Sequence, residues 1–309
     1  MNPRGNRQTL LADPSEPWGR GAQDYLQRRA PRQGTHPRDT PSPVPEPTTT
    51  RPRARQGDPA RQITTGRVSW DPSRVNFDLI PASPTSRALF RLQKSLPTLI
   101  WNAAALEGNT FTLPQVRTLL EGVTIGGKPQ AEADQILALS EGMDIMVSEV
   151  RAGTFTLRKE LSDRIHAAVA RHEAIEAGNF RGEGDVTGGG TVLLARGGRI
   201  DGDPTGSGGN ALVSDHANLL AALSALRDPR AKALVYCASA TRSQFYFDGN
   251  KRTARIMMTG ALIQAGFEAV SIPFIRREEY NFALDTLFTT DDATELIEYL
   301  TTCAPISAG

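Results

Sequence analysis

Helical periodicity restricts the fold of this 309-residue chain more than any other feature. From Pro84 onward, apolar residues recur three or four positions apart in successive segments with helix-starting and helix-ending residues at their boundaries. In the first segment, Ser83 offers a hydroxyl cap and Pro84 suits the first helical position, where no backbone N–H is needed. We expect this helix to bend or restart at Pro97 and to end at Gly108.

The rest of the chain repeats this pattern. Thr112 and Gln115 have the spacing of a capping box, which predicts a short amphipathic helix that ends at Gly122. Other segments with helical spacing span residues 133–150, 157–175, 215–226, 228–243, 250–266, 277–288 and 292–300. The chain is therefore predicted to be mainly α.

Glycine interrupts the helical pattern between residues 178 and 209. So much glycine is incompatible with a packed helix or a core strand, and the only β-like run in the stretch is Thr191–Leu194. We expect a loop that carries a small exposed β-hairpin.

Residues 1–65 differ from the rest of the chain in composition. The first 61 residues hold eleven of the 21 prolines and carry eleven Arg against six Asp or Glu, a net charge of +5, although the whole chain carries only +1. Such a segment buries too little apolar surface to offset the entropy of ordering, so we expect residues 1–65 to form a disordered arm. Its roles can include a solvated tail, a secretion leader, a partner-binding arm or a weak nucleic-acid contact.

Signals for membrane insertion and secretion are missing from the sequence. It contains no run of about 18 apolar residues, which a membrane-spanning helix requires. The amino terminus lacks the charged-then-apolar pattern of a secretory signal. Cys237 and Cys303 lie in apolar surroundings without CxxC spacing, so we expect two buried thiols. These features predict a cytoplasmic protein without a membrane partner.

The stretch SQFYFDGNKRTAR, residues 243–255, concentrates polar side chains in one place. A loop is expected there, followed by a helix that begins near Asn250. A helix amino terminus presents unpaired N–H groups with partial positive charge, so a phosphate can bind at Gly249, Asn250 and Lys251. Gly249 has no Cβ to block close approach.

Charged side chains extend this candidate phosphate site. Arg252 and Arg255 lie three positions apart and share one helix face, where their guanidinium groups can bind further phosphate oxygens. Asp248, beside these cations, can hold a Mg²⁺ ion that bridges two phosphates. The alternative is an ordinary helix start followed by a solvated pair of arginines.

The sequence FxDGNKRTAR resembles the signature loop of the Fic (Fido) family, usually His-x-Phe-x-(Asp/Glu)-Gly-Asn-(Gly/Lys)-Arg-x-x-Arg. Three other segments support the resemblance, which covers roughly residues 85–300. AALEGNTFT is similar to the inhibitory helix of the Fic class that carries it amino-terminal to the core, and TGGGTVLLARGGRID lies where the family has a target-docking flap. IRREEYNFALDTLF resembles the closing helix. The resemblance implies transfer of AMP from ATP to a hydroxyl of a target protein.

The resemblance also assigns roles to single residues. Glu107 matches an inhibitory glutamate, which displaces the γ-phosphate by competing for the guanidinium group of Arg255. Asp248 matches the Mg²⁺ ligand, and Ala103 departs from the Ser or Thr that usually opens the inhibitory motif. The implied catalytic residues are Asp248, Asn250 and Arg252, and the implied nucleotide-binding residues are Gly249, Asn250, Lys251, Arg252 and Arg255.

The catalytic base of the family is replaced here. Gln244 occupies the histidine position and Tyr246 the usual Phe position. Histidine accepts the proton of the hydroxyl that attacks the α-phosphate, whereas an amide has no basicity in this range, and loss of a general base typically costs about 10²–10⁴-fold in rate. No other base is evident in the sequence, because His166 is expected to pack in the core and His172 and His216 at the surface or at helix caps.

Two main functions remain compatible with the sequence. The first is an ATP- and Mg²⁺-dependent nucleotidyl- or phosphoryltransferase of the adenylyltransferase (AMPylase) type, with altered or reduced catalysis. The second is a catalytically inactive nucleotide-binding pseudoenzyme that docks a partner protein through its hairpin. A purely structural or tail-mediated interaction is a third. We expect a protein target at the glycine-rich hairpin and no nucleic-acid partner, and self-association is left open.

The predicted organisation combines these results. A disordered arm (1–65) precedes a helical region with the inhibitory helix (66–125) and a Fic core (126–305). The implied fold class is a mainly α, Fic-like helical bundle with a small β-hairpin flap.

Overall fold

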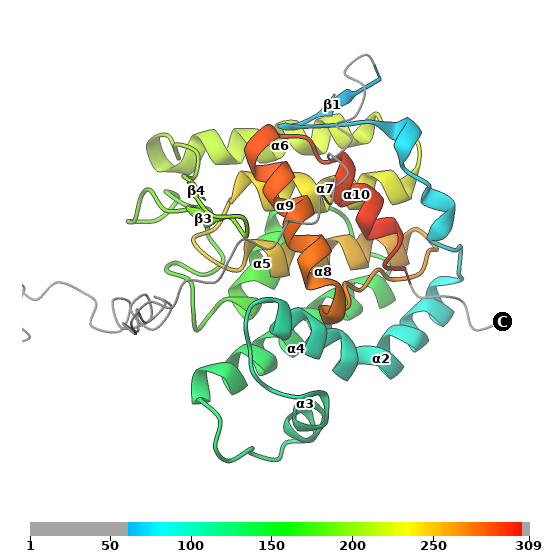
Figure 1. Cartoon of the computed structure of the whole chain (residues 1–309), viewed down its shortest axis with the longest axis vertical. Coiled ribbons are helices and arrows are strands. Elements are labelled where there is room, and N and C mark those ends of the chain that lie inside the picture. The colour runs from blue at the N-terminus through cyan, green and yellow to red at the C-terminus, as the bar shows by residue number, and fades with distance from the viewer. Residues whose placement is uncertain (1–60, 305–309) are drawn as a thin grey trace, which may run out of the picture. The chain divides into compact units, whose positions relative to one another are not determined.

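The computed structural model describes residues 61–304, which are mostly helical (Figure 1). The predicted fold class is confirmed, including the hairpin in the glycine-rich stretch. The helices are α2 (Thr85–Leu106), α3 (Leu113–Leu120), α4 (Gln130–Arg151), α5 (Lys159–Val169), α6 (Asn210–Ser224), α7 (Pro229–Ser243), α8 (Asn250–Gln264), α9 (Arg277–Thr290) and α10 (Thr294–Thr301). The strands are β1 (Ile63–Thr65), β2 (Val68–Trp70), β3 (Val192–Leu193) and β4 (Arg199–Ile200). Short 3₁₀ turns lie at η1 (Pro72–Arg74), η2 (Phe77–Leu79), η3 (Ser207–Gly209) and η4 (Phe274–Arg276).

Helices α7 and α8 form the centre of the described fold (Figure 1). They pack against each other, while α6, α9 and α10 contact α7, and α2, α4 and α5 contact α8. Almost every residue between Ala231 and Ser243, and between Arg252 and Ile263, is buried. The loop that joins them, residues 244–249, is called the motif loop below. Each end of this loop is attached to a buried helix, so the loop has little freedom to move.

Helix α2 continues through Pro97, so the predicted restart does not occur, and a bend at Pro97 stays a prediction. A proline removes one helical hydrogen bond, but α2 has buried residues on both sides of Pro97, including Leu92 and Ile100, and their packing holds both halves of the helix. The predicted end is confirmed, since Gly108 has a φ of +94°, a conformation that glycine adopts without strain. The capping box of Thr112 and Gln115 at the start of α3 is also confirmed.

Two other helix ends differ from the prediction. Ser83 does not cap α2, because its hydroxyl accepts a hydrogen bond from Arg91 at 2.8 Å instead. Helix α5 was expected over residues 157–175, but it stops at Val169. The chain then continues in turns that include Glu173, and these turns bring that side chain toward the motif.

A small hairpin precedes the helices. β1 and β2 pair antiparallel, with Ile63 opposite Trp70, and both Val68 and Trp70 are buried. The prediction of disorder for residues 61–65 is therefore wrong, because strand pairing satisfies their backbone. Residues 1–60 of the expected arm lie outside the described residues. The described parts of the two regions expected beyond the arm, 66–125 and 126–304, belong to one compact unit.

The glycine-rich hairpin, β3 and β4 with their connecting turn, is tied to α9. The buried carboxylate of Asp285 accepts hydrogen bonds from the backbone N–H groups of Ala195 and Arg196, each at 2.8 Å. The guanidinium group of Arg196 also lies 4.4 Å from the centre of the Phe282 ring. The tip of the hairpin is thus held in a defined position.

Arg181 joins the root of this hairpin to the motif loop. Its side chain is fully buried, and burial lowers its pKa. Its Nε donates to the carbonyl of Gln244 at 2.7 Å, and its terminal nitrogens donate to those of Gly188, Gly189 and Asp203 at 2.7, 2.9 and 3.2 Å. One side chain therefore satisfies four backbone acceptors from two segments.

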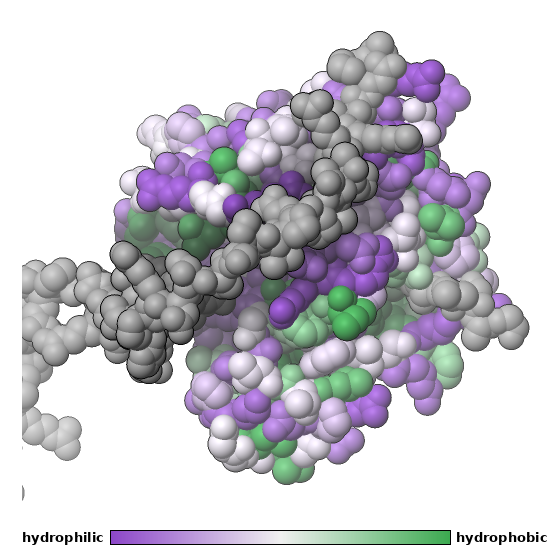
Figure 2. All heavy atoms as spheres, in the orientation of Figure 1, coloured by the Kyte–Doolittle hydropathy of each residue, from purple (hydrophilic) through white to green (hydrophobic). Residues whose placement is uncertain are grey.

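The surface mixes polar and apolar residues. On the face in Figure 2, hydrophobic residues lie in small groups among hydrophilic ones. Ile275 and Leu193 are the most exposed large apolar side chains among the described residues, at 89% and 70%. Between residues 61 and 304, no helix combines the length and apolarity needed to cross a membrane.

Candidate functional site

Gly249 allows α8 to begin where it does. Its φ is +72°, a left-handed conformation, and a Cβ at this position would lie 2.9 Å from the Cβ of Ala170 and 3.3 Å from Nε2 of His166. No larger residue fits without displacing α5 or changing the turn. Glycine is therefore required here by the turn and by packing against α5, and the predicted close approach of a phosphate to Gly249 stays a prediction.

Asn250 closes the motif loop with its side chain. Its Oδ1 accepts from the backbone N–H of Tyr246 at 2.8 Å, and its Nδ2 donates to the Tyr246 carbonyl at 2.7 Å. The same Nδ2 lies 3.1 Å from Oε1 of Gln244. The Asn250 side chain therefore fixes the loop, and both of its N–H donors are used there, so its backbone N–H is the donor that remains for an anion.

Gln244 is also used internally. It ends α7 in a left-handed conformation, with φ of +48°, and only 9% of the residue is exposed. Its Nε2 donates to the Thr241 carbonyl at 2.7 Å, and its Oε1 accepts from Asn250. Both ends of the Gln244 amide therefore have a partner within the protein.

Glu107 lies on the cations of α8. One carboxylate oxygen is 3.0 Å from Nζ of Lys251 and the other is 3.0 Å from a terminal nitrogen of Arg255. Burial of the carboxylate, which is 16% exposed, raises its pKa, but Lys251, Arg255 and Arg252 outweigh burial and hold the pKa at about 2. Glu107 in turn raises the pKa of Lys251. The expected pairing with Arg255 is thus present in the structure, and Lys251 is a second partner.

Arg252 has acidic partners of its own. Its guanidinium group is 4% exposed and lies 3.3 Å from Oδ1 of Asp248. It also forms an ion pair with Glu173, from the turns after α5. Sequence reasoning missed Glu173, because no local pattern connects that segment with α8.

Asp248 fits a role as one ligand of a Mg²⁺ ion. Its side chain is 59% exposed, and its Oδ1 accepts from the backbone N–H of Gly249 and from Arg252. Mg²⁺ commonly takes one or two protein carboxylates and completes its shell with water and substrate phosphates, so a single carboxylate suffices. When bound, the ion would neutralise phosphate charge. No cluster of three or more metal-ligating side chains occurs within residues 61–304.

His166 supports the motif loop from behind. Its Nε2 is 2.8 Å from the Asp248 carbonyl, and its Nδ1 accepts from the backbone N–H of Gly178 at 2.9 Å. Because Nδ1 accepts, Nε2 carries the proton and donates. The ring stacks on Tyr246 at 3.7 Å between centres. Burial lowers the pKa of His166 to about 4, so the neutral ring expected in the core is confirmed.

The other titratable side chains noted in the sequence fall into two groups. His172 is exposed, as predicted, whereas the surface or cap role predicted for His216 is wrong. His216 is 2% exposed among Phe180, Tyr236 and Phe245, and burial lowers its pKa to about 4. Cys237 and Cys303 are free and buried, as expected.

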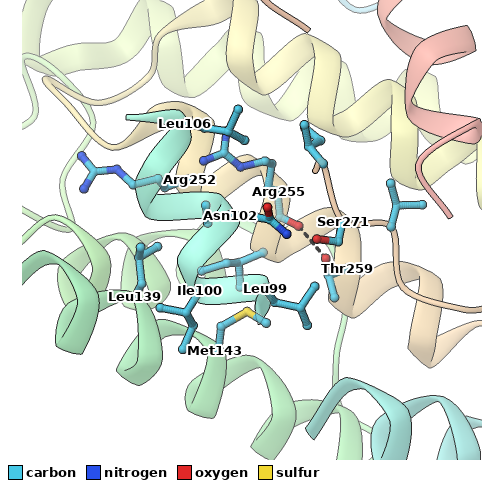
Figure 3. Close-up of a pocket in the computed structure, with 14 residues that line it drawn as sticks. Leu99, Ile100, Asn102, Leu106, Leu139, Met143, Arg252, Arg255, Thr259 and Ser271 are labelled. Carbon is cyan, nitrogen blue, oxygen red and sulfur yellow. Dashed lines mark hydrogen bonds between the residues drawn. The ribbon is translucent and has the colours of Figure 1, made fainter. Parts of the chain in front are cut away.

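A small cavity of about 50 Å³ lies beneath the arginines, between α2, α4 and α8 (Figure 3). Arg252 and Arg255 lie at one end and Met143 at the other, and most of the remaining lining is apolar. Ala103 also lines it, at the position where the family usually has Ser or Thr. The cavity thus separates part of α2 from α8.

Known proteins resemble this chain in sequence. No family model matches the chain. It is 30% identical over 258 residues to a protein named protein adenylyltransferase Fic from Drosophila ananassae, which covers 81% of this chain and 48% of that protein. It is 30% identical over 208 residues to the Aedes aegypti protein of the same name, covering 65% of this chain and 39% of that protein. The chain spans less than half the length of these relatives.

Solved structures show the same fold. A Fic domain containing signaling protein from Bacteroides thetaiotaomicron aligns with a TM-score of 0.59 at 22% identity, covering 73% of this chain and 88% of that one. Fic-1 from C. elegans aligns with a TM-score of 0.53 at 23% identity, covering 71% of this chain and 63% of that one. Together with the relatives above and the motif at the start of α8, they show that this chain belongs to the Fic (Fido) family.

Proposed function

We propose that this protein binds Mg-ATP over the motif loop and the first turn of α8, and transfers AMP slowly to a hydroxyl of a protein target. One observation carries the proposal: both oxygens of Glu107 are paired with cations, Lys251 and Arg255, to which the resemblance assigns phosphate binding. A carboxylate held in this way marks an anion site, because a phosphate makes the same bonds to these groups.

Slow transfer is the expected consequence of Gln244. Arginines and a helix amino terminus supply positioning and charge stabilisation, which carry most of the catalysis in phosphoryl transfer. A base would normally contribute about 10²–10⁴-fold, and an amide bonded to Thr241 and Asn250 contributes none of it.

A second candidate function is nucleotide binding without transfer. The internal bonds of Gln244 favour it, because they leave the attacking hydroxyl without a partner at that position. In both cases we propose that the target protein docks at the β3–β4 hairpin, whose position is held by Asp285 and Arg181.

Calorimetry with Mg-ATP tests the shared part of both candidates. We expect weak binding to the native chain and at least about tenfold tighter binding to Glu107→Gly, because the competing carboxylate is gone. Absence of binding to both forms would refute nucleotide binding altogether.

Labelled ATP then separates the two candidates. Slow labelling of proteins in a lysate by Glu107→Gly, lost on adding Asp248→Ala, would support transfer. If labelling occurs only after a Gln244→His substitution is combined with Glu107→Gly, the protein is a nucleotide-binding pseudoenzyme.

A further inference from the structure

Every cation of the α8 site is already paired with a carboxylate. Glu107 is paired with Lys251 and Arg255. Arg252 has separate partners, Asp248 and Glu173. Removing Glu107 alone therefore leaves Arg252 neutralised, although a nucleotide phosphate needs that guanidinium group as well.

Both oxygens of the Glu173 carboxylate have a partner. Its side chain is 25% exposed, and one oxygen forms the ion pair with Arg252. The other oxygen, Oε1, accepts from Nε2 of Gln135 on α4 at 2.6 Å. With both oxygens engaged, this carboxylate has one orientation, which distinguishes it from a freely rotating surface acid.

The same network reaches the inhibitory segment. Oε1 of Gln135 accepts from Nδ2 of Asn109 at 3.0 Å, and that nitrogen also lies 2.9 Å from the Glu132 carbonyl. Asn109 follows Glu107 by two residues. A continuous series of side-chain contacts, Asn109 to Gln135 to Glu173 to Arg252, thus connects the end of α2 with the first phosphate arginine.

We infer that Glu173 is a second inhibitory carboxylate, which competes with nucleotide phosphate for Arg252 and is coupled to Glu107 through Gln135 and Asn109. The inference rests on the proposed binding of nucleotide at α8. Charge supports it, since three cations face three carboxylates in the absence of ligand. A phosphate chain must displace acids from both arginines to bind all three cations.

A different role for Glu173 would be to hold Arg252 in the orientation that phosphate requires. The two roles predict opposite effects of Glu173→Gln, which keeps the shape of the side chain and removes its charge. A competitor lost tightens Mg-ATP binding, whereas a positioning group lost weakens it.

Calorimetry on the full chain distinguishes them, using Mg-ATP with the native protein, Glu107→Gly, Glu173→Gln and the double variant. We expect Glu173→Gln to tighten binding about fivefold or more in the Glu107→Gly background. Glu141→Gln is the matched control, because Glu141 pairs with Arg171 at the exposed surface and its loss should leave affinity unchanged. Thermal unfolding of each variant verifies that it folds.

The outcomes separate this inference from the proposed function. If Glu107→Gly binds Mg-ATP and the double variant binds equally or more weakly, Glu173 is not a competitor, while nucleotide binding stands. If none of the four proteins binds Mg-ATP, the inference about Glu173 and the proposed nucleotide binding are both refuted. If the double variant binds Mg-ATP about fivefold or more tightly than Glu107→Gly does, the inference and the proposed nucleotide binding are both supported.

Discussion

The pairing of Glu107 with α8 has a thermodynamic consequence that can be measured without any ligand. Its pKa of about 2 lies below the ordinary value of 4.5, so the ionised carboxylate contributes about 3 kcal/mol of stability at pH 7. Glu107→Gln removes that charge and leaves Lys251 and Arg255 without their acid. We expect the variant to unfold more easily at pH 7 by an amount of this order.

The sign of the pH dependence follows from the lowered pKa. A carboxylate whose pKa is lowered by folding stabilises the folded state above pH 4.5, and this contribution is lost as the pH falls toward 2. At pH 3.5 the native protein should have lost about 1.4 kcal/mol of its advantage over Glu107→Gln, because the unfolded state then binds the proton.

Urea unfolding of the native protein and Glu107→Gln at pH 7, 5 and 3.5 measures this difference. Glu141→Gln serves as the control, since an exposed pair typically contributes no more than about 1 kcal/mol. Equal stability of the native protein and Glu107→Gln at pH 7 would refute the reasoning. So would a difference that stays constant between pH 7 and pH 3.5.

Three further predictions concern the scaffold of the site. In thermal unfolding, Gly249→Ala should lower stability more than Gly197→Ala does. Both glycines have positive φ, which destabilises an alanine there by about 1–2 kcal/mol, but only at position 249 would the new Cβ also clash with α5. An equal loss would contradict the packing argument. The stability of His216→Phe relative to the native protein should rise by about 2 kcal/mol when the pH is lowered from 7.5 to 5. The reason is that His216 has a pKa of about 4 in the folded state, so the native protein loses stability as the pH falls below 6.5. A pH-independent difference in urea unfolding would rule this out. Arg181→Met should cost about 3 kcal/mol and speed hydrogen exchange in the β3–β4 hairpin, while the exposed Arg199→Met should change stability by less than about 0.5 kcal/mol. Unchanged exchange in Arg181→Met would show that the hairpin is held elsewhere.

Local patterns predicted the elements of this fold well. The capping box at Thr112 and the glycine stop at Gly108 depend on a few neighbouring residues, and both are present. Pro97 shows the limit of such patterns, because α2 continues through it as one helix although a proline removes one helical hydrogen bond. The end of α5 was missed for a similar reason, since helical spacing continues into residues that the tertiary structure places in turns.

The candidate site was predictable where its residues are adjacent in sequence. Gly249, Lys251 and Arg255 lie within one helical turn and a half, so their proximity follows from helix geometry. Glu173 and Arg181 are more than sixty positions from the motif residues that they contact, Arg252 and Gln244, and no pattern in the sequence relates them to the motif. The orientation of Gln244 was unpredictable too, because it depends on the left-handed end of α7 and on the side chain of Asn250.

The four hydrogen bonds of Arg181 connect the motif loop with the segments that flank the β3–β4 hairpin. In the proposed function the β3–β4 hairpin docks a partner and the motif loop binds nucleotide, and one buried guanidinium group bonds to both segments. If a docked partner shifts the hairpin, the altered bonds change the free energy of the loop. By thermodynamic reciprocity, the factor by which a partner changes nucleotide affinity must equal the factor by which nucleotide changes partner affinity.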